Sequence, residues 1–206
     1  MIIFKKYTHV AALFCLLLFV SGCVSTTNAS TKFYILNPIS DAPSLQKKVK
    51  TKAVSVVIDS LRLPQYLERP QIVMRTSANE LSFAEFHQWG GNLRKNMMRT
   101  LAENLSQLLG SPEISMAPNM SSVPSDFRLE LEILRFEKES NHHVSLSAQW
   151  RILKGKDNTH ITSRLTKLKS KSPVNEKDFA KIVEVMSELF GELSSNIAQA
   201  IIEFNK

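Results

Sequence analysis

Cysteine and glycine are scarce in this sequence. Two cysteines among 206 residues cannot form a disulfide framework or a four-cysteine zinc site. The six glycines form none of the usual phosphate-binding spacings, and neither a G-x-S-x-G nor an H-E-x-x-H pattern occurs. With no motif for nucleotide binding, serine hydrolysis or zinc-dependent proteolysis, we expect a protein that is not an enzyme and that holds no metal or cofactor.

Long hydrophobic runs are also few. The one uninterrupted apolar run covers residues 10–20 and follows the basic pair Lys5 and Lys6. It is shorter than the roughly 20 residues that a helix needs to cross a bilayer. A basic start followed by a short apolar run is typical of a secretory signal. We therefore predict that residues 1–22 are an export signal.

Residues 20–23 read Val-Ser-Gly-Cys and resemble the bacterial lipobox. In signals of that kind the cysteine thiol receives diacylglycerol, the chain is cut before the cysteine, and the new amine is acylated. The resemblance implies acyl chains such as palmitate on Cys23, which exceed the two signals needed for stable membrane attachment. Val24 in place of Asp implies the outer membrane of a Gram-negative cell, facing the periplasm.

Basic residues outnumber acidic ones, and the formal net charge is +7. Lysines cluster at residues 46–52, and a second basic stretch runs through residues 151–171. An export signal argues against nucleic acid as a partner. We interpret both stretches as solvated surface, with anionic lipid headgroups as the alternative partner.

The middle of the chain alternates between strand and helix patterns. We expect strands at residues 33–36, 53–58, 71–75 and 80–83. Ser82 and Glu85 match a capping box, and an apolar stripe with spacings of three and four extends to residue 108, so we predict one long helix there. Gly90 and Gly91 lie inside that stretch and weaken the helix.

The second half has a clearer pattern. Alternating apolar residues predict strands at residues 127–136, 144–152 and 160–168, the first with a bulge at residues 133–134. Asn175, with Asp178 three residues later, predicts the start of a last helix that reaches residue 204. The expected fold class is α+β, an antiparallel sheet with two long amphipathic helices packed on one face. Residues 111–125 are expected to be an irregular loop.

Histidines are the remaining candidates for chemistry. His142 and His143 are adjacent near a predicted hairpin turn, where we favour solvated side chains over a metal site because neighbouring strand residues point to opposite faces. His87 lies two residues from Glu85, a spacing that does not bring the two side chains together on a helix. Neither arrangement supports catalysis.

Residues 61–89 contain a pattern that is more specific than the rest of the sequence. They resemble the signature of PqiC/YmbA-type lipoproteins, the auxiliary lipoproteins of ABC-type and MCE-linked transport systems. The matching residues are Leu63, Pro64, Tyr66, Leu67, Glu68, Arg69, Pro70, Gln71, Ile72, Val73, Arg75, Ala84, Glu85, Phe86 and Trp89. Met74 and His87 depart from the pattern. Residues 33–36 and 101–105 also fit the family.

The resemblance implies an outer-membrane lipoprotein that docks a periplasmic MCE-type protein of a lipid transport system and supports envelope integrity. Its expected partners are that protein, outer-membrane lipids and, in a homo-oligomer, further copies of itself. The alternative is a stand-alone lipid-binding or lipoprotein-sorting factor. The chain then divides into the signal peptide (1–22), an acylated N-terminus with a short strand and tether (23–50), and the auxiliary lipoprotein domain (51–206).

Eleven of the matching residues form the candidate site. They are Leu63, Pro64, Tyr66, Leu67, Arg69, Pro70, Gln71, Arg75, Glu85, Phe86 and Trp89. The prolines prevent regular strand pairing, and the aromatic residues supply large apolar area. Arg69 and Arg75 are expected to close the loop by hydrogen bonds to Glu68, Glu85 or backbone carbonyls. A loop that is only structural and a loop that presents a partner interface both fit these residues.

Overall fold

The computed structural model describes residues 30–40, 53–117 and 124–205. Residues 31–206 form one compact unit. The predicted signal peptide, Cys23 and the lysine cluster at residues 46–52 lie outside the described residues. Within the described ranges, no helix is long and apolar enough to cross a membrane.

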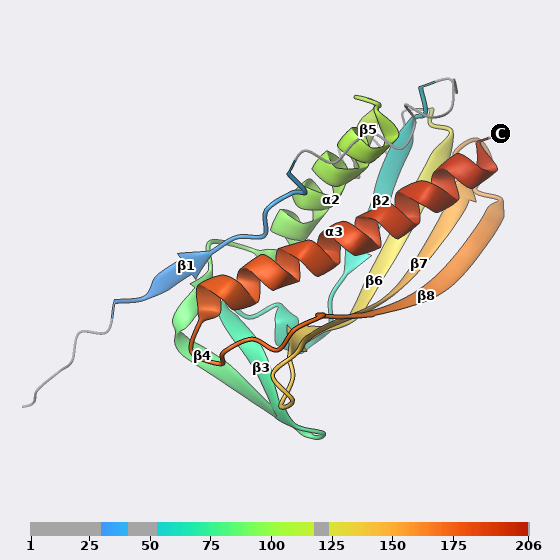
Figure 1. Ribbon diagram of the computed structural model, residues 1–206. Helices are drawn as coiled ribbons and strands as arrows, with labels where there is room; N and C mark the ends of the chain where they lie inside the picture. The colour runs from blue at the N-terminus through green and yellow to red at the C-terminus, as the bar shows by residue number, and fades with distance from the viewer. Residues whose placement is uncertain (1–29, 41–52, 118–123, 206) are drawn as a thin grey trace, which may run out of the picture. The chain divides into compact units, whose positions relative to one another are not determined.

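The described residues contain one mixed sheet of eight strands (Figure 1). The strands are β1 (Lys32–Tyr34), β2 (Val56–Arg62), β3 (Gln71–Ser77), β4 (Glu80–Trp89), β5 (Ile114–Met116), β6 (Phe127–Lys138), β7 (Val144–Lys154) and β8 (His160–Lys169). Their order is β1-β4-β3-β6-β2-β5, and β7 joins the free edge of β6 and carries β8. The twelve-residue strand β6 is the centre of the sheet, because β2 pairs along its first half and β3 meets its last residue, Lys138.

The predicted α+β class is confirmed, but the sheet is not wholly antiparallel. Strands β6, β7 and β8 form the expected antiparallel meander, and β3 with β4 forms a hairpin. By contrast β2 runs parallel to β5 and β6, and β1 runs parallel to β4. Alternation shows which face of a strand is buried but not the direction of its neighbour. The chain between β2 and β5 includes α2, and such a long crossover allows parallel pairing.

Two helices cover one face of the sheet, as predicted (Figure 1). Helix α2 (Leu93–Leu109) packs on β2 and β5, and α3 (Phe179–Phe204) packs on β6, β7 and β8. Between the layers the largest fully buried side chains include Trp150, Phe136 and Phe190. The apolar stripe of α3 is buried from Phe179 to Ile201.

The start of the first helix was predicted wrongly. Residues 80–89 are strand β4, and α2 begins only after Asn92, whose side chain accepts a hydrogen bond from the amide of Lys95. The capping-box pattern at Ser82 is local, whereas pairing with β3 and β1 on both edges of β4 keeps these residues extended. Gly91 has a φ of 140°, a conformation open mainly to glycine, so the two glycines mark the strand-to-helix corner.

Three smaller features of the fold can also be compared with the predictions from sequence. The cap of α3 is Asp178, whereas Asn175 binds the amide of Lys177 in the preceding turn. The expected irregular loop contains β5, a three-residue strand that is too short to show a period. The predicted bulge in β6 is confirmed between Ile133 and Arg135.

Candidate functional site: the signature loop and the N-terminal strand

The signature segment forms the end of β2, a short 3-10 helix η2 (Gln65–Leu67), and the β3–β4 hairpin. Pro64 precedes η2 in an extended conformation, and Leu67, the last residue of η2, is buried. At the other end, the Trp89 amide donates to the carbonyl of Pro70 at 2.7 Å. The loop is therefore held closed against the last residue of the hairpin.

A buried carboxylate fixes this loop from below. Glu137 on β6 is fully buried and accepts hydrogen bonds from the Tyr66 hydroxyl at 2.9 Å and from Nε of Arg75 at 2.9 Å. It also accepts from the amide of Phe136. The expected partners of Arg75 were Glu68, Glu85 or carbonyls; the structure gives it Glu137 and the carbonyl of Ala78. Sequence reasoning missed Glu137 because it lies more than sixty residues away along the chain, in a strand with several other glutamates.

The ionisation of these groups reflects the same contact. Burial, followed by the charge and hydrogen bond of Glu137, raises the pKa of Tyr66. Burial by itself would lower the pKa of Arg75. The hydrogen bond and the charge of Glu137 outweigh this effect, so the pKa of Arg75 is raised. The tyrosine stays neutral and the arginine charged, so the loop is attached by two charge-assisted hydrogen bonds.

The remaining signature residues divide into a packed and an exposed set. Leu67 and Trp89 are buried, and Leu63, Pro64, Tyr66, Gln71 and Arg75 are half-buried. Arg69, Pro70, Glu85 and Phe86 are exposed. The Arg69 guanidinium lies over the Phe83 ring, 4.7 Å from its centroid, which holds an exposed cation in place. The structure brings the loop and hairpin residues together, but Glu85 makes no contact that closes the loop in the described structure.

The segment after β1 lies along both helices, and we call residues 35–40 the N-terminal strap. Asn96 of α2 accepts from the Leu36 amide at 2.8 Å and donates to the Leu36 carbonyl. Two turns later, Asn104 accepts from the Ile39 amide at 2.9 Å. Thr100, between them, also donates to the Leu36 carbonyl. These polar residues repeat at spacings of four, so one face of α2 binds the strap backbone.

Helix α3 holds the other side of the strap. The Asn37 amide donates to Ser187, and Asn104 donates to the buried Ser194 at 3.0 Å. The side chain of Ile39 fills the space above Gly191, where a Cβ would lie 2.4 Å from Ile39 Cγ2. The signal for this arrangement was present in the sequence, because Asn96, Thr100 and Asn104 form a polar row at helical spacing beside the apolar stripe.

Strand β1 is joined to the domain through His87. The Tyr34 hydroxyl lies 2.8 Å from Nδ1 of His87, and the imidazole stacks on Phe179 at the start of α3, with ring centroids 3.8 Å apart. Burial and the charge of Lys32 lower the pKa of His87, while burial and Asp178 raise the pKa of Tyr34. The lowered pKa favours the neutral imidazole in this contact with the tyrosine hydroxyl.

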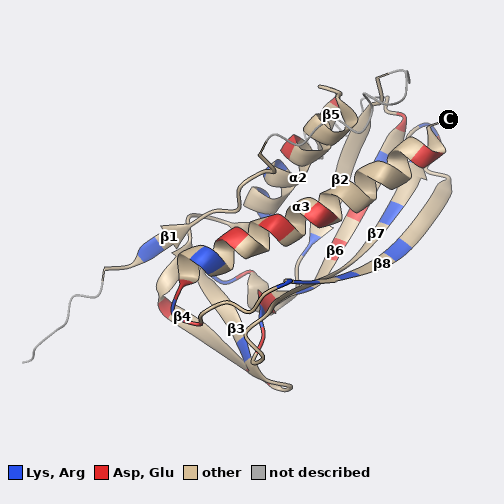
Figure 2. Ribbon diagram, viewed as in Figure 1, with Lys and Arg blue, Asp and Glu red and all other residues tan. Residues whose placement is uncertain are grey.

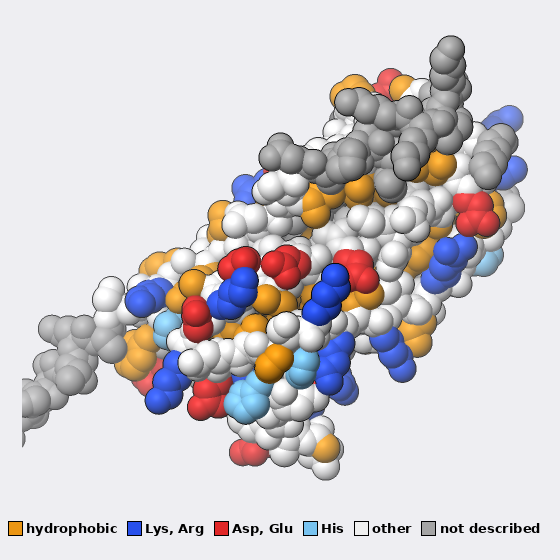
Figure 3. Space-filling view, in the orientation of Figure 1, with side chains coloured by type: hydrophobic (Ala, Val, Ile, Leu, Met, Phe, Trp, Pro, Cys, Tyr) orange, Lys and Arg blue, Asp and Glu red, His pale blue; other side chains and the backbone are white. Residues whose placement is uncertain are grey.

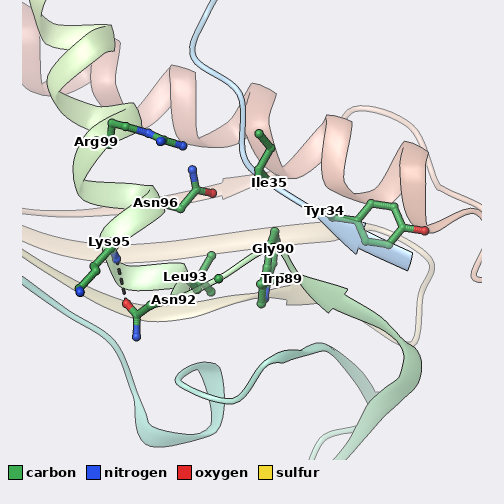
Figure 4. Close-up of a pocket in the computed structure, with 10 residues that line it drawn as sticks. Tyr34, Ile35, Trp89, Gly90, Asn92, Leu93, Lys95, Asn96 and Arg99 are labelled. Carbon is green, nitrogen blue, oxygen red and sulfur yellow. Dashed lines mark hydrogen bonds between the residues drawn. The ribbon is translucent and has the colours of Figure 1, made fainter. Parts of the chain in front are cut away.

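A surface pocket of about 320 Å³ lies where β1, the end of β4 and the first turns of α2 meet (Figure 4). Its lining combines the apolar Ile35 with the basic Lys95 and Arg99, and Arg99 extends toward Asn96 and Ile35 in the close-up. Phe33 beside it is 66% exposed, the most exposed large hydrophobic residue in the described ranges.

Other parts of the surface are charged. The outward side of α3 carries Glu184, Glu188 and Glu192 four residues apart, with Lys181 near its start (Figure 2). In the space-filling view charged side chains lie along the helix layer with hydrophobic side chains between them, and further hydrophobic side chains reach the surface near β1 (Figure 3). Across the described residues, no cluster of three or more His, Cys, Asp or Glu side chains could hold a metal ion. His142 and His143 lie in the β6–β7 turn, where Nδ1 of His143 contacts the Ser170 carbonyl at 2.8 Å.

The fold is that of an α+β domain with an N-terminal strap held between two helices. Residues 34–198 match the family of ABC-type transport auxiliary lipoprotein components, and the chain belongs to this family. The family is defined by a part in transport and not by an enzymatic activity, and an auxiliary component implies partners in a transport system.

Solved structures share this fold. A crystal structure of an uncharacterised protein is 22% identical, with a TM-score of 0.64 over 84% of this chain and 99% of the other. Protein XCC0632 from Xanthomonas campestris is 12% identical, with a TM-score of 0.62 over 82% of this chain and 90% of the other. A comparison with curated protein sequences finds no match.

Proposed function

We propose that this chain is the outer-membrane lipoprotein subunit of an MCE-type system that moves phospholipids between the two bacterial membranes. Anchored through Cys23, it would hold the periplasmic MCE protein at the outer membrane and so support envelope integrity. The observation that carries the proposal is the match of residues 34–198 to a family of transport auxiliary lipoproteins. The lipobox-like residues 20–23 support the anchor.

The signature loop is suited to a partner contact because its underside is fixed. Glu137 holds Tyr66 and Arg75, so Arg69 and Pro70 are presented on a rigid frame. A preorganised surface loses less conformational entropy on binding than a mobile loop does. Arg is also among the residues that most often dominate the binding energy of protein interfaces.

The partner contact is tested by co-purification after mild cross-linking in membranes. Arg69→Glu should abolish recovery of the MCE protein, because it reverses a charge on the presented surface. Arg94→Glu is the matched control, since Arg94 is an exposed arginine on α2 outside the loop. A wild-type chain that recovers no MCE protein would refute this function, and equal recovery with both variants would remove the loop from the interface.

The anchor is tested separately by labelling cells with a palmitate analogue. The wild-type chain should carry the label and sediment with outer membranes, and Cys23→Ser should lose both properties. A labelled chain found only in the inner membrane would contradict the proposed location.

A lipid carrier with its own acyl cavity is not favoured. Trp150, Phe136 and Phe190 fill the space between the sheet and α3 and are at most 1% exposed. An acyl chain would have to displace these side chains, which would cost several kcal/mol.

A further inference from the structure

We propose that the surface around β1 lies directly against the lipid headgroups of the membrane that holds the anchor. We call this surface the β1 patch and define it by the apolar Phe33 and Ile35 and the basic Lys95 and Arg99. The inference rests on the proposed anchoring at Cys23 and adds which face of the domain contacts lipid.

The apolar part of the patch is contiguous. Phe33 pairs with Gln88 on β4, and paired residues of neighbouring strands share a face. Phe33 also lies near Gly90, where an added Cβ would be 3.9 Å from Phe33 Cβ. Beyond β1, Ile35 lies over Gly90, where a Cβ would be 3.2 Å from Ile35 Cγ2. Phe33 and Ile35 are 66% and 48% exposed, so two large apolar side chains face solvent together.

The basic groups on the α2 side of the patch complement an anionic bilayer, whereas its α3 side is acidic. Lys95 and Arg99 line the pocket that Ile35 also lines. The acidic groups nearby include the exposed Glu85 and Glu103, the latter 3.8 Å from Nε of Arg99. On the other side of the patch, Glu184 and Glu188 of α3 line one hollow with Phe33 and Ile35. Exposed aromatic residues flanked by Lys and Arg are typical of surfaces that enter the interfacial layer.

The short chain between the anchor and the domain limits which face of the domain can lie against the membrane. Eight peptide units join Cys23 to Thr31, so even a fully extended chain spans at most about 28 Å. The 26-residue helix α3 alone is about 39 Å long. An acylated Cys23 therefore keeps the start of β1 close to the lipid, whereas the exposed Leu165 on the far edge strand β8 has no such constraint.

The test uses the full-length acylated chain in vesicles of phosphatidylethanolamine and phosphatidylglycerol that contain brominated lipid. Cys15 leaves with the predicted signal peptide and an acylated Cys23 has no free thiol, so F33C introduces a single site for an environment-sensitive fluorophore. L165C is the matched control, because Leu165 is also exposed (56%) and apolar. We expect severalfold stronger quenching at position 33 than at position 165, with a blue-shifted emission only at position 33.

Charge is tested in the same vesicles. K95E combined with R99E should reduce quenching at position 33, as should omission of phosphatidylglycerol, whereas K167E on β8 should leave it unchanged. Quenching unaffected by either change would overturn the electrostatic part of the proposal.

The outcomes separate the anchor from the docking. An acylated chain whose probe at position 33 is quenched no more than the probe at position 165 overturns the docking alone. Emission that is already blue-shifted without lipid, and is not quenched by bromine, would mean that a second copy covers the patch, which also overturns it. A chain that carries no acyl label would show that the anchor is absent. This face would then have no reason to lie against the membrane.

Discussion

At the scale of single residues, Glu137 is the group on which the signature loop depends most. It is fully buried, and it accepts from a tyrosine hydroxyl, a guanidinium and a backbone amide at once. Removing one partner of a buried ion pair leaves the other uncompensated and typically costs about 3–5 kcal/mol.

We therefore expect Glu137→Gln to lower the free energy of unfolding by about 3 kcal/mol in urea denaturation. Tyr66→Phe removes one hydrogen bond to a charged group and should cost about 1.5–3 kcal/mol. Glu132→Gln is the control, because Glu132 lies exposed on the same strand. Equal stabilities for Glu137→Gln and Glu132→Gln would show that the buried contact contributes nothing.

His87 makes the junction of β1 sensitive to pH. Its pKa is lowered by burial and by Lys32, so the unfolded chain binds a proton more readily than the folded one. The stability that depends on the neutral imidazole is complete above the ordinary histidine pKa of about 6.5 and is lost as the pH falls below it. Asp178, whose charge raises the pKa of Tyr34, is an acidic group at the same junction.

The expected result is a wild-type protein that loses stability between about pH 7.5 and about pH 5, and a His87→Gln variant with a flatter profile. Unfolding by urea across this range measures the difference. Parallel profiles for the two proteins would exclude His87 as the titrating group.

Gly91 shows how one residue ends one element and begins the next. Its φ of 140° lies in a region that side chains with a Cβ rarely adopt, although nothing lies within 4 Å of an added Cβ. Gly91→Ala should therefore destabilise the protein by about 1–3 kcal/mol through backbone strain alone. Gln199→Gly, at an exposed position of α3, is a control for ordinary helix propensity, at about 1 kcal/mol or less. Thermal unfolding of both variants makes the comparison.

At the scale of elements, the N-terminal strap is a strand-like segment bound by helices. Its backbone amides at Leu36 and Ile39 donate to side chains of α2 and not to another strand. The chain that follows β1 is therefore fixed to both helices through its backbone.

Asn96→Ala should release this segment, with faster amide hydrogen exchange at Leu36 and a loss of about 1–3 kcal/mol because the strap's polar groups lose their partner. Asn92→Ala is the matched control. It removes the cap of α2, at about 1 kcal/mol, without touching the strap. If Leu36 stays protected in Asn96→Ala, the side chain does not hold the strap.

At the scale of the whole molecule, a filled core favours a protein that connects other components over one that carries lipid. The layer between sheet and helices is occupied by Trp150, Phe136 and Phe190, and the pocket at the β1 end is a surface feature. Acidic side chains lie along the outward side of α3 (Figure 2).

We accordingly expect the purified chain to move no fluorescent phospholipid between vesicles above the rate without protein. Transfer should rise only when the MCE protein is added. Stoichiometric extraction of lipid by the chain alone would contradict the docking role and would require the core to open.

The strongly periodic parts of the fold were predictable from sequence. Strands β6 and β7 and helix α3 have long periodic patterns, because each buries one face along most of its length. The residues of the signature loop were also found, through their resemblance to a family. The partner of Arg75 was not, because pairing with Glu137 depends on how two distant strands meet.

The sequence by itself determined the class of the fold, the periodic elements and the family, because local hydrophobic spacing and short motifs persist in any correct structure. Only the tertiary structure decided that residues 80–89 are a strand, that β2 and β1 pair in parallel, and that a polar row on α2 binds the strap. The physical reason is that backbone hydrogen bonds and buried charges must find partners wherever the packed chain provides them. Those partners are set by contacts between residues that are distant in sequence, which no local pattern encodes.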